Sequence, residues 1–208
     1  MADIIGRVEF FPPFEAPRQL PQPPVPEWIR PPATQLPAIV PLRLLVYRSE
    51  SIVVALEAAR VYTSGVTLEV RWARRRTSET QSEWINATRG PWGHPRPGWP
   101  GSIRFGIQYP DGSKAFTDPR PGMPPAVDFR ATPKGPVLHQ AGGSSDGGDH
   151  DMQTGDFRLW AWPLPGPGAH RLYVEWLDAA LPESFVEFDG GALHEAAADA
   201  RPFWPDSV

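Results

Sequence analysis

The sequence predicts an all-β protein, namely an antiparallel β-sandwich of the immunoglobulin-like kind with about seven to nine strands. Two segments, GVTLEVRWA from Gly65 and SIRFGIQY from Ser102, alternate apolar and polar residues, as strands with one buried face do. Turn signals such as Asp111-Gly112 separate such segments. No helices of crossover length alternate with them, so the sequence does not favour a parallel sheet.

Five further segments complete the predicted sandwich: VPLRLLVY, IVVALEAARVY, FRLWAW, HRLYVEW and SFVEF. FRLWAW is unusual because both of its faces are apolar. Trp160 and Trp162 share one face, and the residues between and before them form the other. We therefore expect this to be a central strand that an arm or a helix covers.

Two short helices are expected beside the strands. The first lies in SETQSEWINAT, with Ser78 as the N-cap and Gln81 as its reciprocal partner. The second spans about residues 190–201, with Asp189 as the cap and Pro202 as the stop. We expect this C-terminal helix to close one end or edge of the sandwich.

The apolar face of the C-terminal helix continues beyond its predicted end. Leu193, Ala197 and Ala200 recur at helical spacing. Phe203 and Trp204 follow directly, and we expect them to extend the same apolar side.

Proline is concentrated near the N-terminus. Eleven of the 28 prolines lie between Pro12 and Pro41, and proline lacks the amide donor that helices and central strands need. The sequence thus divides into a proline-rich extended arm, residues 1–37, and a single β-sandwich domain, residues 38–208. Apolar anchors within the arm, such as Trp28, indicate that it lies on a protein surface.

Charge and cysteine content bear on partners and location. The net charge is −4, with 17 basic and 12 acidic residues in 1–137 but 3 basic and 12 acidic in 138–208. An acidic chain lacks the electrostatic footprint of a nucleic-acid binder, so we interpret the basic cluster RWARRR, from Arg71 to Arg76, as a solvated strand end. Without cysteine, an export signal or an apolar run of membrane-spanning length, we expect a soluble, cytoplasmic protein with no nucleic-acid or membrane partner.

No catalytic motif is recognisable. The chain has neither a nucleophile elbow nor a phosphate-binding loop. HEAAA, from His194 to Ala198, lacks the second histidine of a zinc-protease helix. We therefore predict a protein that is not an enzyme, with no catalytic residue, no metal ligand and no cofactor.

An acidic, glycine-rich stretch leads into the aromatic strand. Asp146, Asp149, Asp151 and Asp156 provide four carboxylates, and oxygen-rich loops of this density can bind Ca²⁺. The spacing does not follow the EF-hand pattern. We interpret residues 142–156 as a flexible, solvated connection, and a calcium-dependent protein that uses the loop 146–156 stays as an alternative.

Four ordered segments resemble a family of uncharacterised actinobacterial proteins: VPLRLLVYRSESIVVALEAARVYTSGVTLEV, IRFGIQYPDGSKA, DMQTGDFRLWAWPLPGPGAHRLYVEW and ALHEAAADARPFWP. The resemblance covers about residues 25–205. It implies no activity, cofactor or site.

The candidate contact residues are Trp92 and Trp99, in the proline-rich loop RGPWGHPRPGWPGS. Prolines stiffen this loop, so its indole rings could stack on sugars or on side chains of a partner; alternatively, both rings fold back over the sandwich. The leading prediction is a non-enzymatic β-sandwich module for protein interaction or structure, with a protein partner or self-association. The alternative is a small-ligand or carbohydrate-binding sandwich that uses Trp92 and Trp99.

Overall fold

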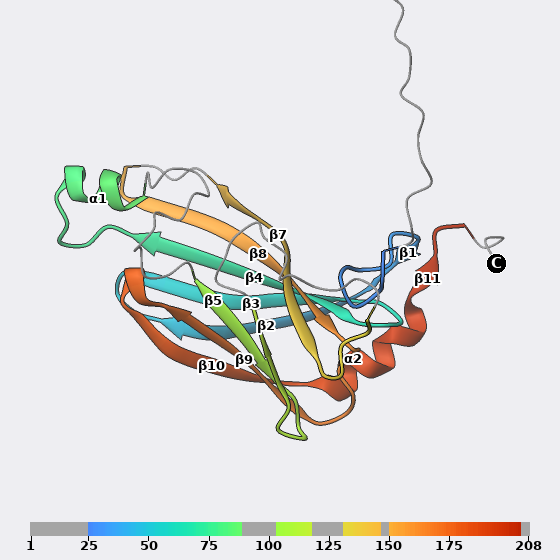
Figure 1. Cartoon of the computed structure of the whole chain (residues 1–208). Helices are drawn as coiled ribbons and strands as arrows, with labels where there is room; N and C mark the ends of the chain where they lie inside the picture. The colour runs from blue at the N-terminus through green and yellow to red at the C-terminus, as the bar shows by residue number, and fades with distance from the viewer. Residues whose placement is uncertain (1–24, 89–102, 118–130, 147–149, 205–208) are drawn as a thin grey trace, which may run out of the picture.

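The computed structural model describes residues 25–88, 103–117, 131–146 and 150–204, and it confirms the all-β sandwich (Figure 1). Its strands are β1 (Gln35–Leu36), β2 (Ala38–Arg48), β3 (Ile52–Val61), β4 (Val66–Arg75), β5 (Arg104–Gln108), β6 (Lys114–Phe116), β7 (Val137–Asp146), β8 (Met152–Trp162), β9 (Ala169–Trp176), β10 (Leu181–Asp189) and β11 (Arg201–Pro202). Its helices are α1 (Gln81–Thr88) and α2 (Gly190–Ala196), with short 3₁₀ turns at Leu177–Ala179 and Ala197–Asp199.

Nine strands form two antiparallel sheets that pack face to face. The larger sheet has the order β2-β3-β4-β8-β7, and the smaller has the order β10-β9-β5-β6. At one edge of the sandwich β10 lies beside β2, and at the other β6 lies beside β7. The strand order was not predicted: β2, β3 and β4 are consecutive in one sheet, whereas an immunoglobulin chain changes sheet after its second strand.

The core lies between the two sheets and is built from the alternating residues that predicted the strands. Leu68 and Val70 of β4 face it from the larger sheet, and Phe105 and Ile107 of β5 face it from the smaller one. All four side chains are buried. The intervening residues point away from the core, so an apolar residue among them needs a separate explanation.

The glycine-rich stretch forms β7, and the prediction of a flexible connection over residues 142–156 is wrong where the structure describes it. β7 pairs with β8, with Gly143 opposite Phe157. A Cβ atom at Gly143 would lie 2.6 Å from the carbonyl oxygen of Asp156, and one at Gly155 would lie 2.7 Å from the ring of Trp72. Only glycine permits these close approaches. Because glycine has a low strand propensity, the sequence pattern did not predict a strand here.

The inserted helix exists, but it begins two residues later than predicted. The Thr80 amide donates to the Glu83 carboxylate at 2.8 Å, and the Glu83 amide donates to the Thr80 hydroxyl at 3.3 Å. This reciprocal pair is a capping box with Thr80, not Ser78, as its first residue. Both pairs, Ser78 with Gln81 and Thr80 with Glu83, match the sequence pattern. A carboxylate is the stronger acceptor at a helix N-terminus.

The C-terminal helix closes one end of the sandwich, where α2 packs against β2 and β3. Asp189 caps it as predicted, accepting from the Gly191 amide at 2.9 Å, and Leu193 is fully buried. The expectation for Phe203 and Trp204 is wrong, because both side chains are exposed. β11 pairs with β1 directly after the helix, and the Phe203 amide donates to the carbonyl oxygen of Thr34 at 2.8 Å, so the chain has left the helical path before the two rings.

The described part of the arm covers the outer face of the larger sheet. Trp28 is buried, and its ring lies 6.4 Å from that of His139 on β7. The indole nitrogen of Trp160 donates to the carbonyl oxygen of Glu27 at 2.9 Å, and Trp160 is 0% exposed. The strand with two apolar faces is therefore covered by the arm, as its sequence indicated. The assignment of residues 1–37 to a separate arm stays a prediction.

Candidate functional site

A row of aromatic side chains crosses the outer face of the smaller sheet. The registers place Phe116 of β6 opposite Gly106 of β5, Gly106 opposite Tyr173 of β9, and Tyr173 opposite Phe185 of β10. We call these four residues the aromatic row. Since cross-strand neighbours on one face are in direct reach of each other, the row is continuous except at its glycine.

The two phenylalanines of the row are exposed in spite of their size. Phe116 is 76% exposed and Phe185 is 50% exposed. Tyr173 is held in place, because its hydroxyl donates to the side-chain oxygen of Gln108 at 2.9 Å and its ring lies 5.2 Å from that of Phe185. The guanidinium of Arg171 lies 5.0 Å from the centre of the Phe185 ring. Contacts thus orient Tyr173 and Phe185, whereas Phe116 is separated from them by Gly106.

Gly106 leaves a gap in the row, which we call the aromatic slot. The slot belongs to a groove of about 380 Å³ on this face. The outward side chains that line the groove are Arg104, Gln108, Lys114, Phe116, Tyr173, Glu175 and Glu183. A Cβ atom at Gly106 would meet only Tyr173 and the carbonyl of Ala115, both at 3.6 Å, which is an ordinary contact distance. The fold itself therefore does not require glycine here.

Charged residues flank the aromatic row on both sides. Arg104 forms an ion pair with Glu175 on the side toward the start of β5. On the other side Arg171 pairs with Glu187 at 3.2 Å. Hydrogen bonds with Tyr173 and Glu187 raise the pKa of Arg171. Each flank carries both a positive and a negative side chain. The groove therefore has an apolar centre and polar rims, as protein-contact sites do.

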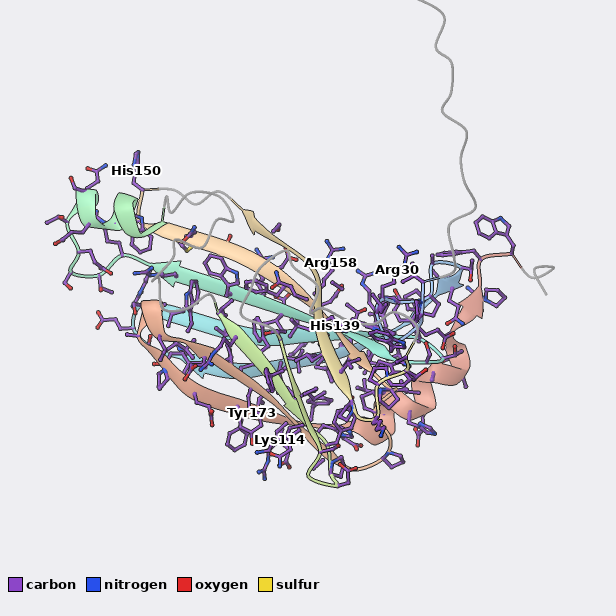
Figure 2. All side chains as sticks on the ribbon, in the orientation of Figure 1. Arg30, Lys114, His139, His150, Arg158 and Tyr173 are labelled. Atoms are coloured by element: carbon purple, nitrogen blue, oxygen red, sulfur yellow. The ribbon has the colours of Figure 1, made fainter. Side chains whose placement is uncertain are left out.

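The groove lies on the opposite side of the molecule from the arm. Figure 2 shows Tyr173 and Lys114 projecting from the smaller sheet, with Arg30, His139 and Arg158 on the far side. β6, the three-residue strand that carries Phe116, is the edge of its sheet. Phe116, at this edge of the slot, is 76% exposed in the part of the chain that the structure describes.

The predicted contact residues Trp92 and Trp99 lie outside the described residues, so their prediction is untested. Asp149 also lies outside them. Of the other carboxylates of the acidic stretch, Asp151 accepts from Arg76 at 2.8 Å and Asp156 accepts from Ser144. Within the described residues, His, Asp and Glu side chains form no group of three that could hold a metal ion.

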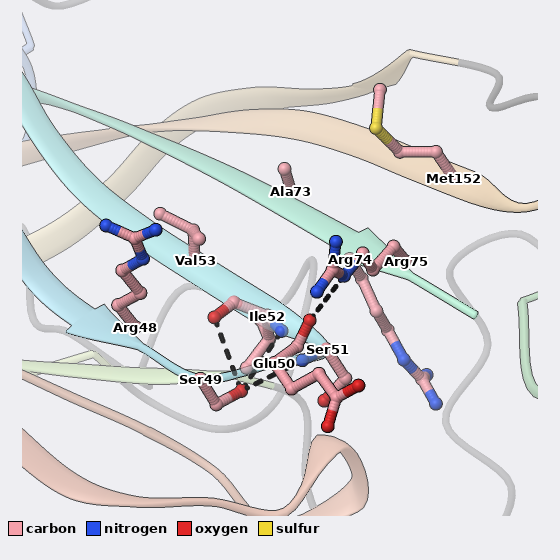
Figure 3. A pocket seen from close by; sticks show the side chains of 10 residues that line it. All are labelled: Arg48, Ser49, Glu50, Ser51, Ile52, Val53, Ala73, Arg74, Arg75 and Met152. Carbon is pink, nitrogen blue, oxygen red and sulfur yellow. Dashed lines mark hydrogen bonds between the residues drawn. The ribbon is translucent and has the colours of Figure 1, made fainter. Parts of the chain in front are cut away.

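The basic cluster is engaged with the chain itself. Arg74 stacks 5.2 Å from the Trp84 ring centre and lies 3.7 Å from the Glu79 carboxylate. Arg75 donates to the carbonyl oxygen of Glu50. A second hollow, of about 250 Å³, lies beside these side chains at the turn between β2 and β3 (Figure 3). Because Arg74 and Arg75 already have partners, this hollow is a weaker candidate than the groove.

Sequence reasoning missed the aromatic row, for which the sequence offers only a local pattern at Tyr173. Tyr173 alternates with the buried Leu172 and Val174 and shares its face with charged Arg171 and Glu175. A single aromatic residue on a charged strand face is common and does not by itself indicate a contact surface. What the sequence did not provide was the strand order that aligns the three rings.

None of the helices in the described residues is long and apolar enough to cross a membrane. No protein-family model, no curated protein and no solved structure matches the chain.

Proposed function

We propose that the protein is a non-enzymatic interaction module and that the aromatic slot is its contact surface for a protein partner. The observation that carries this proposal is the exposure of two phenylalanines on either side of Gly106, on a sheet whose other face already forms the core. Complete burial of a large aromatic side chain removes about 150–250 Å² from water, and a partner can cover the 76% of Phe116 and the 50% of Phe185 that are exposed. Such clustered apolar exposure is typical of binding surfaces.

Energetics favour a contact centred on this row. At about 25 cal/mol per Å², covering two phenylalanine rings stabilises a complex by several kcal/mol before the costs of association. Interface anchors are enriched in aromatic residues that sit in a ring of polar groups. Arg104, Glu175 and Lys114 provide such a rim around the slot. This chemistry describes the partner as an apolar segment with polar groups of both signs beside it.

A carbohydrate or another small ligand is the second candidate for this groove. Its support is the Tyr173 hydroxyl bonded to Gln108, because polar groups beside an aromatic face are what sugars need. The role of Trp92 and Trp99 in such binding stays a proposal from the sequence, as do the actinobacterial relationship and the cytoplasmic location. Calorimetry against a glycan panel decides between the two candidates, since a protein-contact site gives no heat of binding there.

The interaction proposal predicts that Phe185→Ala weakens the complex by at least about tenfold. Truncating an aromatic anchor costs about 2 kcal/mol or more when the partner packs against it. The measurement is native mass spectrometry of the untagged protein from its own host, followed by titration of the component that copurifies. We expect a dimer or a bound protein with wild type and loss of that species with Phe185→Ala.

The matched control is Phe203→Ala. Phe203 and Phe185 are the same residue type and are both 50% exposed, but Phe203 lies outside the row. The control should bind like wild type. Equal weakening by both substitutions, or full binding by Phe185→Ala, would contradict the proposed site.

A further inference from the structure

We infer that the partner of the aromatic slot is a second copy of this chain, packed face to face through the smaller sheet. This inference rests on the proposed function, because it names the protein that the slot contacts. The two copies are related by a two-fold axis that runs parallel to the strands, between β9 and β5, which are neighbours at the centre of this sheet. The outer face of the sheet is complementary to itself when it is turned about that axis.

The strand registers place the outward residues of the smaller sheet in three rows. The aromatic row lies in the middle. On one side of it Glu175 of β9 lies opposite Arg104 of β5. Because the axis lies between β9 and β5, it brings β9 of one copy over β5 of the other, and β10 over β6. The row on the other side contains, in the order β10, β9, β5 and β6, the residues Glu187, Arg171, Gln108 and Lys114.

The second copy places a large side chain over the gap in the aromatic row. Tyr173 of each copy comes to lie over Gly106 of the other, where no side chain projects. Phe185 of each copy comes to lie over Phe116 of the other, and these are the two exposed rings of the row. Each ring thus meets either the gap or another ring, as in the interdigitated faces of packed sheets.

The charges of the two outer rows also match. Glu187 of one copy faces Lys114 of the other, and Glu175 of one copy faces Arg104 of the other. The remaining arginine faces a neutral glutamine. Because the axis is two-fold, each match occurs twice. No two like charges face each other among these residues. Such a match of the face with itself favours a second copy over a partner of unrelated sequence.

A two-fold axis along the aromatic row is the other way to pair this face with itself, and it is less favourable. It would bring Glu187 of one copy toward Glu183 of the other, since these two residues lie on β10 on opposite sides of the row. It would also place Gly106 over Gly106, so the gap would receive no side chain. The charges and the gap therefore both select the axis parallel to the strands.

The geometry of packed sheets allows these contacts. Sheets that pack face to face lie about 10 Å apart and keep their strand directions within about 30° of each other. Lys114 and Glu187 are the outermost of the matched residues, and each lies about 10 Å from the centre of the contact at the usual strand spacing. A rotation of about 30° displaces them by about 5 Å. Long charged side chains span such a displacement.

The size of the face predicts a weak dimer. Four strands at a spacing of about 4.8 Å, and about six residues along each at about 3.3 Å, give a flat contact of roughly 400 Å². A standard protein interface buries about 800 Å² per partner. We therefore expect a dissociation constant of about 1–100 μM. A two-fold contact uses the same face on both copies, so assembly stops at the dimer.

Charge reversal at Glu187 and Lys114 tests this arrangement. The two residues lie on β10 and β6, the two edges of the sheet, and are about 14 Å apart within one copy at the usual strand spacing. They therefore face each other only between copies. Glu187→Lys places two lysines opposite each other, and Lys114→Glu places two glutamates opposite each other. Each variant alone should dimerise at least about tenfold more weakly than wild type.

The double variant and a mixture of the single variants identify the contact. Glu187→Lys/Lys114→Glu restores opposite charges between the copies and should dimerise within about threefold of wild type. An equimolar mixture of the two single variants should also form dimers of wild-type strength, because one copy of each then brings opposite charges together at both contacts. Sedimentation velocity of the full-length untagged protein over roughly 1–300 μM covers the expected range of dissociation constants.

The matched controls are Glu195→Lys and Arg158→Glu. They make charge changes of the same size at exposed residues on α2 and on the outer face of the larger sheet, and both should dimerise like wild type. Three results would overturn the inference: a monomer throughout this concentration range, a dimer that the single reversals leave unchanged, or a weakened dimer that neither the double variant nor the mixture restores.

The result can be separated from that of the partner experiment. If the pure protein is monomeric while Phe185→Ala abolishes a complex with a different protein from the host, the inference fails and the proposed function stands. If Phe185→Ala leaves every complex at wild-type strength, the dimer included, the proposed function fails as well.

Discussion

Replacement of Trp160 by alanine should lower the free energy of unfolding by about 3–5 kcal/mol, the usual cost of truncating a buried aromatic residue. Trp160 is 0% exposed although it points away from the main core. Its ring packs edge-on to Tyr62 at 5.7 Å, and its indole nitrogen donates to the carbonyl oxygen of Glu27. The substitution leaves a cavity beneath the arm and removes the partner of that carbonyl.

Thermal unfolding gives the direct measurement of this effect. For a domain of this size about 1 kcal/mol corresponds to roughly 2–4 °C, so Tm should fall by about 6–20 °C. Limited proteolysis should also cleave earlier within residues 25–34, since the arm loses its contact with β8. Trp204→Ala removes an equally large ring that is 63% exposed and should change Tm by no more than about 2 °C. Similar losses from both substitutions would refute the packing described for the arm.

Stability should fall as the pH is lowered below about 6.5, the ordinary pKa of histidine. His170 is fully buried, and burial lowers its pKa, opposed by the Gly168 carbonyl and by Asp189 and Asp111. Its Nδ1 lies 3.0 Å from the Gly168 oxygen. Burial also lowers the pKa of His139. The neutral forms are thus favoured in the folded state.

The sign of the pH effect follows from proton uptake. Below about pH 6.5 the unfolded chain binds more protons than the folded one, so stability decreases toward acid by up to about 1.4 kcal/mol per pH unit for each such histidine. Below the lowered folded-state pKa this contribution becomes constant. Urea unfolding between pH 8 and 5.5 measures the slope, and His170→Phe should reduce it by keeping an uncharged ring against Phe188. An unchanged slope in His170→Phe would show that His170 is not the group responsible.

The sequence predicted those helices and strands that are determined by neighbouring residues. Alternation identified β4 and β5, and the cap at Asp189 identified the start of α2. β7 was missed because its glycines have low strand propensity and become strand only through close contact with β8 and Trp72. Likewise the exposure of Phe203 depends on the β1–β11 pairing, which joins segments far apart in the chain.

The candidate site could not be predicted because it forms only when strands far apart in the sequence pair in the observed order. Phe116, Gly106, Tyr173 and Phe185 come from four strands, and only the order β10-β9-β5-β6 brings them into one row. Each residue by itself is an unremarkable strand residue. Trp92 and Trp99 were predicted instead, because their proline-rich loop can be recognised from neighbouring residues alone. The aromatic row requires the strand order, which the sequence does not show.

The partner affinity of Gly106→Val tests whether the aromatic slot is the contact surface. Valine has a higher strand propensity than glycine, and a Cβ atom at this position meets its neighbours at 3.6 Å. We expect an unchanged or higher Tm together with at least a tenfold loss of partner affinity, about 1.4 kcal/mol. A folded Gly106→Val protein that binds its partner with wild-type affinity would show that the slot is not the contact surface.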